Sequence, residues 1–468
     1  MNKKILIVVI ALAVIIGGGL AGTSVVSSKT EERFTQIHEN ANEQYAPNKF
    51  ELVSYERGFL TSKAVTKITL DNAYLAAFMD SDFKEEVAVT VEHEIYHGPF
   101  ILGKADGGVL GLVSSSSKIN LESLPFEPIQ KIFGGKEQPV LKSKVGFGGD
   151  MEVMLQSPEY GDIEIAREGT ATIMPLEMKM KVSSDKKSVK GDLEWKGFKL
   201  LVPKNSGTEE GTAGMENLVV EFDQQQTEEE IWVGGSKSVV SLIYFKVQSS
   251  DSPINFEMTD LGVESNVAAA EEVLNTGTKF SFKNLSFKDK KFGPGELAIN
   301  LNSIDKSAYV ELTKWAEDMD WAAMTKMSSS DDYYVRQQAQ QQSEEYFGEL
   351  KLQLLKLLGK QPYLEIENLS LTTLDGDLKG TGKVSLGEID PALLANPMGV
   401  FAALMAVKAE SNLRAPIGLL KDSPQYYRQV NAMVDAGFLK KEGEDLVIDA
   451  KFAGGQLTVN GNPIPLFQ

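Results

Sequence analysis

The sequence predicts a β-rich α+β protein: a single N-terminal transmembrane helix, then extended antiparallel sheets, with ββα units and helices in the C-terminal half. Three observations predict this class. An uncharged apolar run fills residues 5–28, segments with a period near two follow it, and helical patterns gather in the second half. The 468 residues, of which 42% are hydrophobic, are enough for more than one domain with a sizeable core.

The apolar run from Ile5 to Ser28 predicts a membrane anchor. It is as long as the roughly 20 residues that span a bilayer, and Lys3 and Lys4 before it favour a cytoplasmic N-terminus. A cleaved signal peptide is the alternative, because Gly19-Leu20-Ala21 offers small residues for cleavage, although apolar residues continue to Val26. We expect a single-pass protein with one large exported part.

Charge and cysteine content exclude several classes of function. The exported part carries 45 basic and 66 acidic residues, a net charge of −21. This argues against a nucleic-acid partner and against docking by charge onto an anionic membrane face. The chain has no cysteine, which excludes disulfides, thiolate zinc sites, Fe–S clusters and cysteine nucleophiles. We expect no cofactor.

The predicted organisation has four parts: a transmembrane anchor or signal peptide at 1–28, a helical stalk at 29–49, a β-rich domain at 50–275, and a mixed ββα domain with a C-terminal hairpin at 276–468. Strand-like segments bounded by Gly, Asp, Asn and Ser define the third part. They are Lys63–Leu70, Glu86–His97, Gly161–Glu168, Leu176–Ser184, Gly191–Leu200, Asn217–Phe222 and Ser238–Val247.

Two segments of the last part resemble each other and predict a repeated ββα unit. Asn284–Asp305 and Asn368–Asp390 each give strand, turn, strand and a closing Ile-Asp, and a helical pattern follows each, to Met324 and Glu410. Asp305 and Asp390 are suitable helix N-caps. Further helices are predicted over Asp331–Leu358 and Pro416–Lys440, and the chain ends with strands around the turn Asn460-Gly461.

The string His93-Glu94-Ile95-Tyr96-His97 matches the HExxH pattern of zinc peptidases. That pattern needs a helix, which brings both imidazoles to one metal, whereas here apolar and polar residues alternate and Gly98-Pro99 ends the run. On a strand, positions i and i+4 lie about 13 Å apart, too far for one zinc. We therefore expect locally hydrogen-bonded histidines and a fold that tolerates His93→Ala. A zinc hydrolase using His93, Glu94 and His97 is the alternative.

Three stretches in order along the chain resemble the YdgA-like family of Gram-negative envelope proteins. They are YERGFLTSKA (Tyr55–Ala64), EIYHGPF (Glu94–Phe100) and GGQLTVNGNPIPL (Gly454–Leu466). The resemblance implies an inner-membrane anchor and a periplasmic body, and it implies no activity. The matching residues are expected to be structural, with Arg57 beside a carboxylate: Tyr55, Arg57, Gly58, His97, Gly98, Pro99, Asn460 and Gly461.

The long strands and the ββα ending are also similar, at the level of architecture, to AsmA-like envelope proteins, whose elongated sheets carry an apolar groove associated with lipid. The expected function is therefore a non-catalytic binding or scaffold module of the cell envelope. Its expected partners are the inner membrane and either a lipid or an envelope protein complex.

Overall fold

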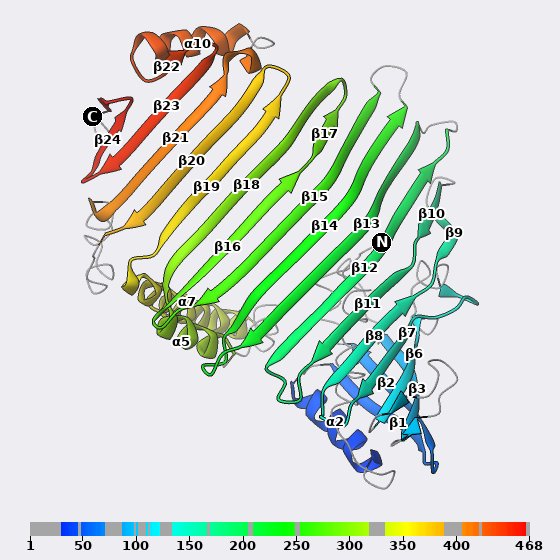
Figure 1. Ribbon diagram of the computed structural model, residues 1–468. Coiled ribbons are helices and arrows are strands. Elements are labelled where there is room, and N and C mark those ends of the chain that lie inside the picture. Colours follow the sequence, from blue (N-terminus) through cyan, green and yellow to red (C-terminus); the bar gives the residue numbers. More distant parts are fainter. Residues whose placement is uncertain are drawn as a thin grey trace. The chain divides into compact units, whose positions relative to one another are not determined.

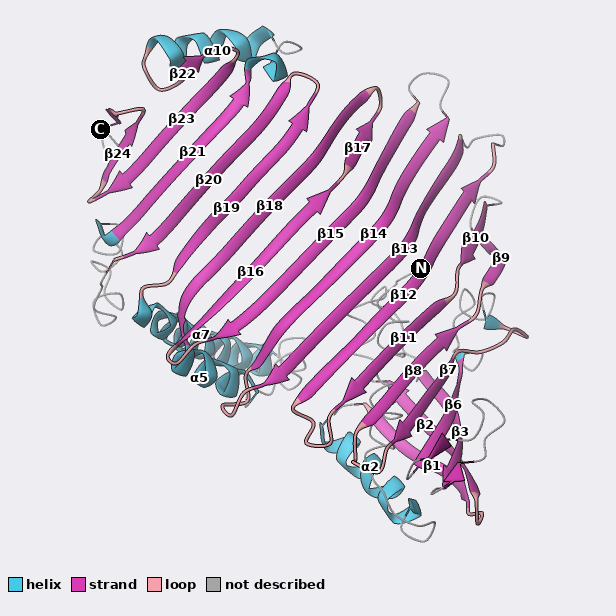
Figure 2. Ribbon diagram, viewed as in Figure 1, coloured by secondary structure: helices cyan, strands magenta, loops and turns pink. Residues whose placement is uncertain are grey.

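The computed structural model describes residues 30–44, 48–70, 87–97, 100–101, 109–110, 113–121, 133–165, 169–204, 209–248, 253–317, 333–387, 405–420 and 424–464. The chain forms two compact units: unit 1 is residues 1–225 with 246–252, and unit 2 is residues 226–245 with 253–468. Strands dominate both units (Figure 2), which confirms the β-rich class. Within the described ranges, no helix combines the length and apolar character needed to cross a bilayer. The anchor predicted at residues 1–28 lies outside these ranges.

The described part of unit 1 has a large antiparallel sheet, a separate two-stranded sheet of β4 and β5, and the helix α2. Its elements are α2 (Thr30–Gln44), β1 (Lys49–Glu56), β2 (Thr61–Leu70), β3 (Val87–His97), β4 (Phe100–Ile101), β5 (Val109–Leu110), β6 (Val113–Asn120), β7 (Val140–Val145), β8 (Met151–Ser157), β9 (Tyr160–Ile165), β10 (Gly169–Ile173), β11 (Leu176–Val182), β12 (Ser188–Val202) and β13 (Glu210–Gln226). Strand β14 (Trp232–Gln248) contributes residues to both units.

The strands of unit 1 pair in the order β1, β2, β3, β6, β7, β8, β11, β12, β13, and every pairing is antiparallel. The hairpin of β9 and β10 does not interrupt this order. It pairs with the later part of the long strand β12, beyond the part that pairs with β11. One edge of β12 is therefore shared by two partners in succession.

Helix α2 packs on one face of the sheet, against β1, β2 and β3, and forms part of the core of unit 1. Phe34, His38 and Ala41, spaced as one face of a helix, are all buried. In β2 and β3 every second residue is buried, as the alternation in the sequence predicts. The helical character expected for residues 29–49 is confirmed for Thr30–Gln44, and these contacts make α2 part of the core rather than a projecting stalk.

Unit 2 is an antiparallel sheet with helices near the ends of its strands (Figure 1). Its elements are β15 (Ile254–Ala269), β16 (Val273–Phe282), β17 (Asn284–Phe287), β18 (Lys290–Asp305), α5 (Lys306–Glu317), α7 (Tyr333–Lys356), η2 (Leu357–Lys360), β19 (Tyr363–Thr373), β20 (Gly376–Leu386), β21 (Val407–Pro416), η3 (Ile417–Leu420), α10 (Pro424–Asp435), β22 (Lys440–Glu442), β23 (Asp445–Ala453), β24 (Gln456–Val459) and β25 (Asn462–Ile464).

The main order of unit 2 is β15, β16, β18, β19, β20, β21, β23, β24, β25. Short β17 lies between β15 and β18 at one end, and β22 pairs with β23. In Figure 1, α5 and α7 lie near one end of these strands and α10 lies near the other.

The first ββα unit is confirmed by β17, β18 and α5. Asp305 caps α5: its Oδ1 accepts a hydrogen bond from the Ala308 backbone N–H at 3.0 Å and another from the Ser307 hydroxyl at 2.7 Å. For the second unit, β19 and β20 form the predicted hairpin, but Asp390 and Pro391 lie outside the described residues.

Two helix predictions are wrong in part. Residues Val407–Glu410, expected to end a helix, begin β21. The helix expected over Pro416–Lys440 is confined to α10, because Pro416 ends β21 and Gly437, with φ of 77°, ends the helical region. Pairing of β21 with β20 and β23 overrides the local helical preference.

Candidate functional site

Strand β3 carries the HExxH string, and its strand conformation confirms the prediction. His93 and His97 point into the core, with exposures of 2% and 6%. Glu94 lies on the opposite face, where it accepts a hydrogen bond from the Tyr96 hydroxyl at 2.8 Å. The two imidazoles and the carboxylate therefore do not converge, and the string does not have the geometry of a zinc peptidase.

Buried polar side chains link α2 to three strands through His93. His38 Nδ1 lies 2.6 Å from the Phe34 carbonyl oxygen, and His38 Nε2 lies 2.9 Å from the Thr66 hydroxyl. That hydroxyl lies 3.0 Å from His93 Nε2, and His93 Nδ1 lies 2.7 Å from the Ser117 hydroxyl. We call His38, Thr66, His93 and Ser117 the histidine ladder.

The proton positions in the ladder follow from the contact between His38 and the Phe34 carbonyl oxygen. A carbonyl oxygen can only accept, so His38 Nδ1 carries a proton and a neutral His38 accepts at Nε2 from the Thr66 hydroxyl. Thr66 Oγ1 then accepts from His93 Nε2–H, and His93 Nδ1 accepts from Ser117. Every ring nitrogen is satisfied with both histidines neutral, and neither nitrogen of His93 is available to a metal.

Burial favours the neutral form of these histidines. Burial, with the nearby His38 adding to it, lowers the pKa of His93 to about 3. Burial also lowers the pKa of His38, against the opposing hydrogen bond to Phe34. For His97, burial and then the positive charge of Arg57 lower the pKa. The neutral imidazole is therefore the favoured form of all three side chains.

The hairpin loop between β1 and β2 brings together several of the residues that carry the family resemblance. The Gly58 backbone N–H donates to the Ser62 hydroxyl at 3.2 Å, and that hydroxyl lies 2.9 Å from His97 Nε2. The His97 backbone N–H donates to the Leu60 carbonyl oxygen at 2.9 Å. A Cβ at Gly58 would lie 1.9 Å from the Thr61 carbonyl oxygen, so only glycine fits there.

The remaining resemblance residues have mostly structural positions. The Tyr55 ring packs on Phe34 with centroids 5.8 Å apart. No carboxylate of the described residues forms an ion pair with Arg57, which lies instead near His97. Gly98 and Pro99 lie outside the described residues.

The Asn460-Gly461 turn joins β24 to β25 with φ of 50° and 84°. Both positive values confirm the tight turn that the sequence predicts. Asn460 Nδ2 donates to the carbonyl oxygens of Phe438 and Val447 at 3.1 and 3.2 Å, and its Oδ1 accepts from the Asp449 backbone N–H. The turn therefore fixes the C-terminal hairpin to the preceding strand.

One face of the unit 2 sheet is apolar and open to solvent, and we call it the apolar face. Residues directly opposite in antiparallel strands share a face, so the register defines its rows. None of the residues in the row from β18 to β25 is buried, and Leu301, Leu364 and Val384 are 37%, 44% and 46% exposed. That row is Leu301, Leu364, Val384, Ala409, Phe452, Leu457 and Ile464.

The opposite face of the same sheet is polar. Lys279 and Glu296 form an ion pair at 2.6 Å, and Asn368 donates to Glu296 at 2.7 Å. Lys383 lies over the Tyr363 ring, 3.9 Å from its centroid. The sheet therefore separates a charged face from an apolar one, although neither is buried by the described residues.

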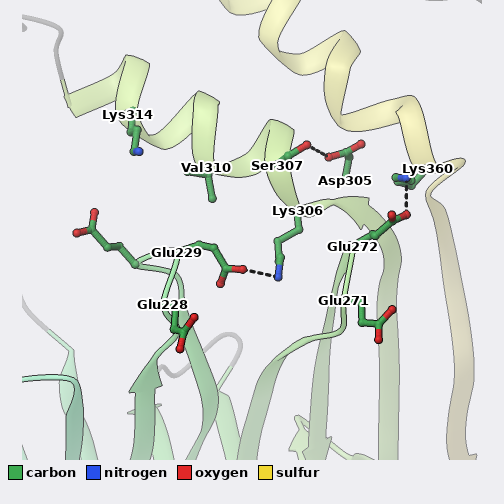
Figure 3. A pocket seen from close by; sticks show the side chains of 11 residues that line it. Glu228, Glu229, Glu271, Glu272, Asp305, Lys306, Ser307, Val310, Lys314 and Lys360 are labelled. Atoms are coloured by element: carbon green, nitrogen blue, oxygen red, sulfur yellow. Dashed lines mark hydrogen bonds and ion pairs between the residues drawn. The ribbon is translucent and has the colours of Figure 1, made fainter.

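An acidic hollow of about 680 Å³ lies in unit 2 at the start of α5 (Figure 3). Lys306 pairs with Glu229 at 2.8 Å and Lys360 with Glu272 at 2.6 Å. Ion pairs of this exposed kind contribute little to stability. Among the described residues no group of three or more His, Asp or Glu is arranged to hold a metal ion. The lining residues are Glu228, Glu229, Glu230, Glu271, Glu272, Asp305, Lys306, Ser307, Val310, Lys314 and Lys360.

Sequence reasoning missed the hydroxyl partners of His93 and His97 and the exposure of the apolar face. The sequence did indicate these hydroxyl partners, because Ser62 and Thr66 occupy the same alternating positions of β2 as Ala64 and Ile68 and therefore face the core. Nothing in the sequence indicated the exposure of the apolar face, because alternation shows that a strand has an apolar face but not whether anything covers it.

We predict that His93→Ala lowers the free energy of unfolding by about 2–4 kcal/mol, since it leaves a cavity and removes a partner from two buried hydroxyls. This reverses the tolerance expected from sequence. Urea unfolding of residues 29–468, followed by circular dichroism, measures it. Glu94→Ala, on the solvent face of the same strand, is the control and should change stability by no more than about 0.5 kcal/mol. Equal effects of the two substitutions would contradict the ladder.

The ladder also predicts acid sensitivity. When a histidine has a lower pKa in the folded state than in the unfolded state, the folded protein loses stability as the pH falls below the unfolded pKa of 6.5. For His93 this loss reaches about 2 kcal/mol at pH 5 and grows until the folded pKa of about 3. Urea unfolding at neutral pH and at pH 5 tests it. His93→Gln, which does not titrate, should lose less stability on acidification than the wild type; an identical loss would refute the assignment.

The clash at Gly58 predicts that Gly58→Ala destabilises unit 1 by about 1–3 kcal/mol, because backbone must move to admit the methyl group. Gly148→Ala is the matched control in another loop, where a Cβ would meet only the Asp150 carboxylate at 3.9 Å. Thermal unfolding of the two variants side by side measures the difference. A Gly58→Ala variant as stable as Gly148→Ala would show that the loop is not constrained as described.

Comparison with known proteins yields one match. Neither the curated proteins nor the solved structures contain a match to this chain. A family model described as "Bacterial protein of unknown function (DUF945)" matches residues 1–467. The resemblance to the YdgA-like family fits this result, since YdgA is a DUF945 protein. With its whole length matched, the chain belongs to this bacterial DUF945 family.

Proposed function

We propose that this protein is a non-catalytic envelope protein, anchored in the bacterial inner membrane by its N-terminal segment, whose periplasmic body binds lipid acyl chains on the apolar face. The apolar run after Lys3 and Lys4 and the bacterial family support the location. The ladder supports the absence of catalysis at HExxH, because both nitrogens of His93 are engaged inside the core.

The apolar face carries the proposal. Contiguous exposed apolar surface of this extent is unusual on a protein that functions alone in water, and marks a binding surface. Its row from Leu301 to Ile464 crosses seven strands. At about 4.8 Å per strand spacing the row is roughly 30 Å long, about twice the hydrocarbon depth of one bilayer leaflet.

Acyl chains suit this face better than a polypeptide does. The backbone groups of the central strands are already paired within the sheet, and the row offers no side-chain hydrogen-bonding group. A protein segment laid on it would have to satisfy its own backbone, whereas an acyl chain has no polar group to satisfy. Small residues in the neighbouring row, Gly382, Ser411 and Ala450, leave room between the larger side chains.

The matched substitutions Val384→Lys and Thr381→Lys test lipid binding, since both lie on β20 but on opposite faces. We expect native mass spectrometry of the protein, purified from membranes in mild detergent, to show lipid-sized adducts. Val384→Lys should reduce their occupancy several-fold, because an ammonium group is costly to bury beside acyl chains, and Thr381→Lys should not. A bare mass, or equal loss in both variants, would overturn the lipid proposal and favour a scaffold that binds a protein partner.

The anchor has a separate test. The full-length chain should stay in the membrane pellet after an alkaline carbonate wash, because an uncleaved segment of this length spans the bilayer. Replacing residues 1–28 with a cleavable signal peptide should release the remainder into the soluble periplasmic fraction. A wild-type protein already in that fraction would show that the segment is removed during export.

A further inference from the structure

Apolar side chains are exposed at one end of unit 1, on two loops. Phe59 and Leu60, between β1 and β2, are 89% and 57% exposed, and Phe147, between β7 and β8, is 58% exposed. The two loops lie at the same end of the sheet, because Val145 pairs with Val113, which pairs with His97, and His97 donates to Leu60. We call Phe59, Leu60 and Phe147 the loop tips.

The chain that precedes the described residues enters at this same end. Phe34, near the start of α2, contacts Tyr55 at the end of β1, while Asn42, near the end of α2, exchanges two hydrogen bonds with Phe50 at 2.7 and 2.9 Å. Helix α2 therefore runs antiparallel to β1. Thr30 lies about 6 Å beyond Phe34 along the helix axis, in the direction in which the β1–β2 loop extends beyond Tyr55.

A single residue, Lys29, separates Thr30 from the apolar run that ends at Ser28. A segment that spans the bilayer must therefore leave it within a few ångströms of this end of unit 1. We infer that the loop tips insert into the interface of the membrane that holds the N-terminal segment. This inference rests on the anchoring in the proposed function and is independent of lipid binding on the apolar face.

The chemistry of the tips fits a bilayer surface. Bulky apolar side chains at the ends of narrow loops can enter the boundary between headgroups and acyl chains, where burial of their surface is favourable. Exposed Arg57 and Lys186 lie at the same end, since the turn at Lys186 contacts the β7–β8 loop through a hydrogen bond from the Ser184 N–H to Asp150. The exposed carboxylates of Asp150 and Asp185 lie there as well. Attachment by apolar tips does not need the charge attraction that the net charge of −21 opposes.

The absence of cysteine gives a clean experiment, because a single introduced cysteine is labelled without background. Phe59→Cys and Phe147→Cys variants of the full chain, each carrying an environment-sensitive fluorophore, are reconstituted in vesicles of phosphatidylcholine with a minority of phosphatidylglycerol. The control is Leu201→Cys, which is 38% exposed near the far end of β12. Labels at Phe59 and Phe147 should emit at shorter wavelength and be quenched by brominated acyl chains, whereas the control label should report water.

The outcomes separate the two hypotheses. Protein that floats with vesicles while the Phe59 and Phe147 labels report water, as the control does, would overturn the insertion and leave the anchor intact. Protein that fails to float with vesicles would overturn both. A labelled variant with a lowered melting temperature is replaced by the neighbouring Leu60→Cys, so that a misfolded loop does not decide the result.

Discussion

The constraint on which the rest of this structure depends is that an antiparallel sheet with one apolar face must have that face covered. Unit 1 meets it within the described residues: α2 lies against the sheet, and Phe34 packs beside Tyr55 and His93. Unit 2 repeats the alternation of strands, but its helices lie near the strand ends, and no residue of the row from Leu301 to Ile464 is buried. Both units thus have strands with one apolar face, and they differ in whether the described residues cover that face.

The histidine ladder shows how unit 1 accepts polar groups in its core. Four side chains from α2, β2, β3 and β6 form a chain of hydrogen bonds in which each donates to the one before it, and His38 donates to the Phe34 carbonyl oxygen. Such a network is favourable only when every member is satisfied. It fixes the position of α2 on the sheet more narrowly than apolar packing would, since a shift by one helical turn would separate His38 from Thr66.

Much of the fold was predictable because the signals are local. Alternating Val residues predicted β3 to within one residue, Asn460-Gly461 predicted the final turn, and Asp305 predicted the start of α5. The secondary-structure predictions fail where pairing with other strands determines the conformation of a segment. The segment around Val407–Glu410 has helical propensity but pairs with β20 on one side and with β23 on the other. The candidate site was less predictable: the histidines were evident, but Thr66 and Ser117 meet His93 only through strand register, and exposure of the apolar face is a property of the whole unit.

The order of the strands in unit 2 has a consequence for how this chain acquires its structure. Nearly every long strand pairs with the next one along the sequence, from β18 through β19 and β20 to β21. Contacts are therefore close in sequence, so each strand loses little chain entropy when it joins the growing edge. A sheet of this kind can form one strand at a time as the polypeptide becomes available from its N-terminal side. Until the next strand arrives, the exposed edge is the part of the molecule most open to pairing with another chain.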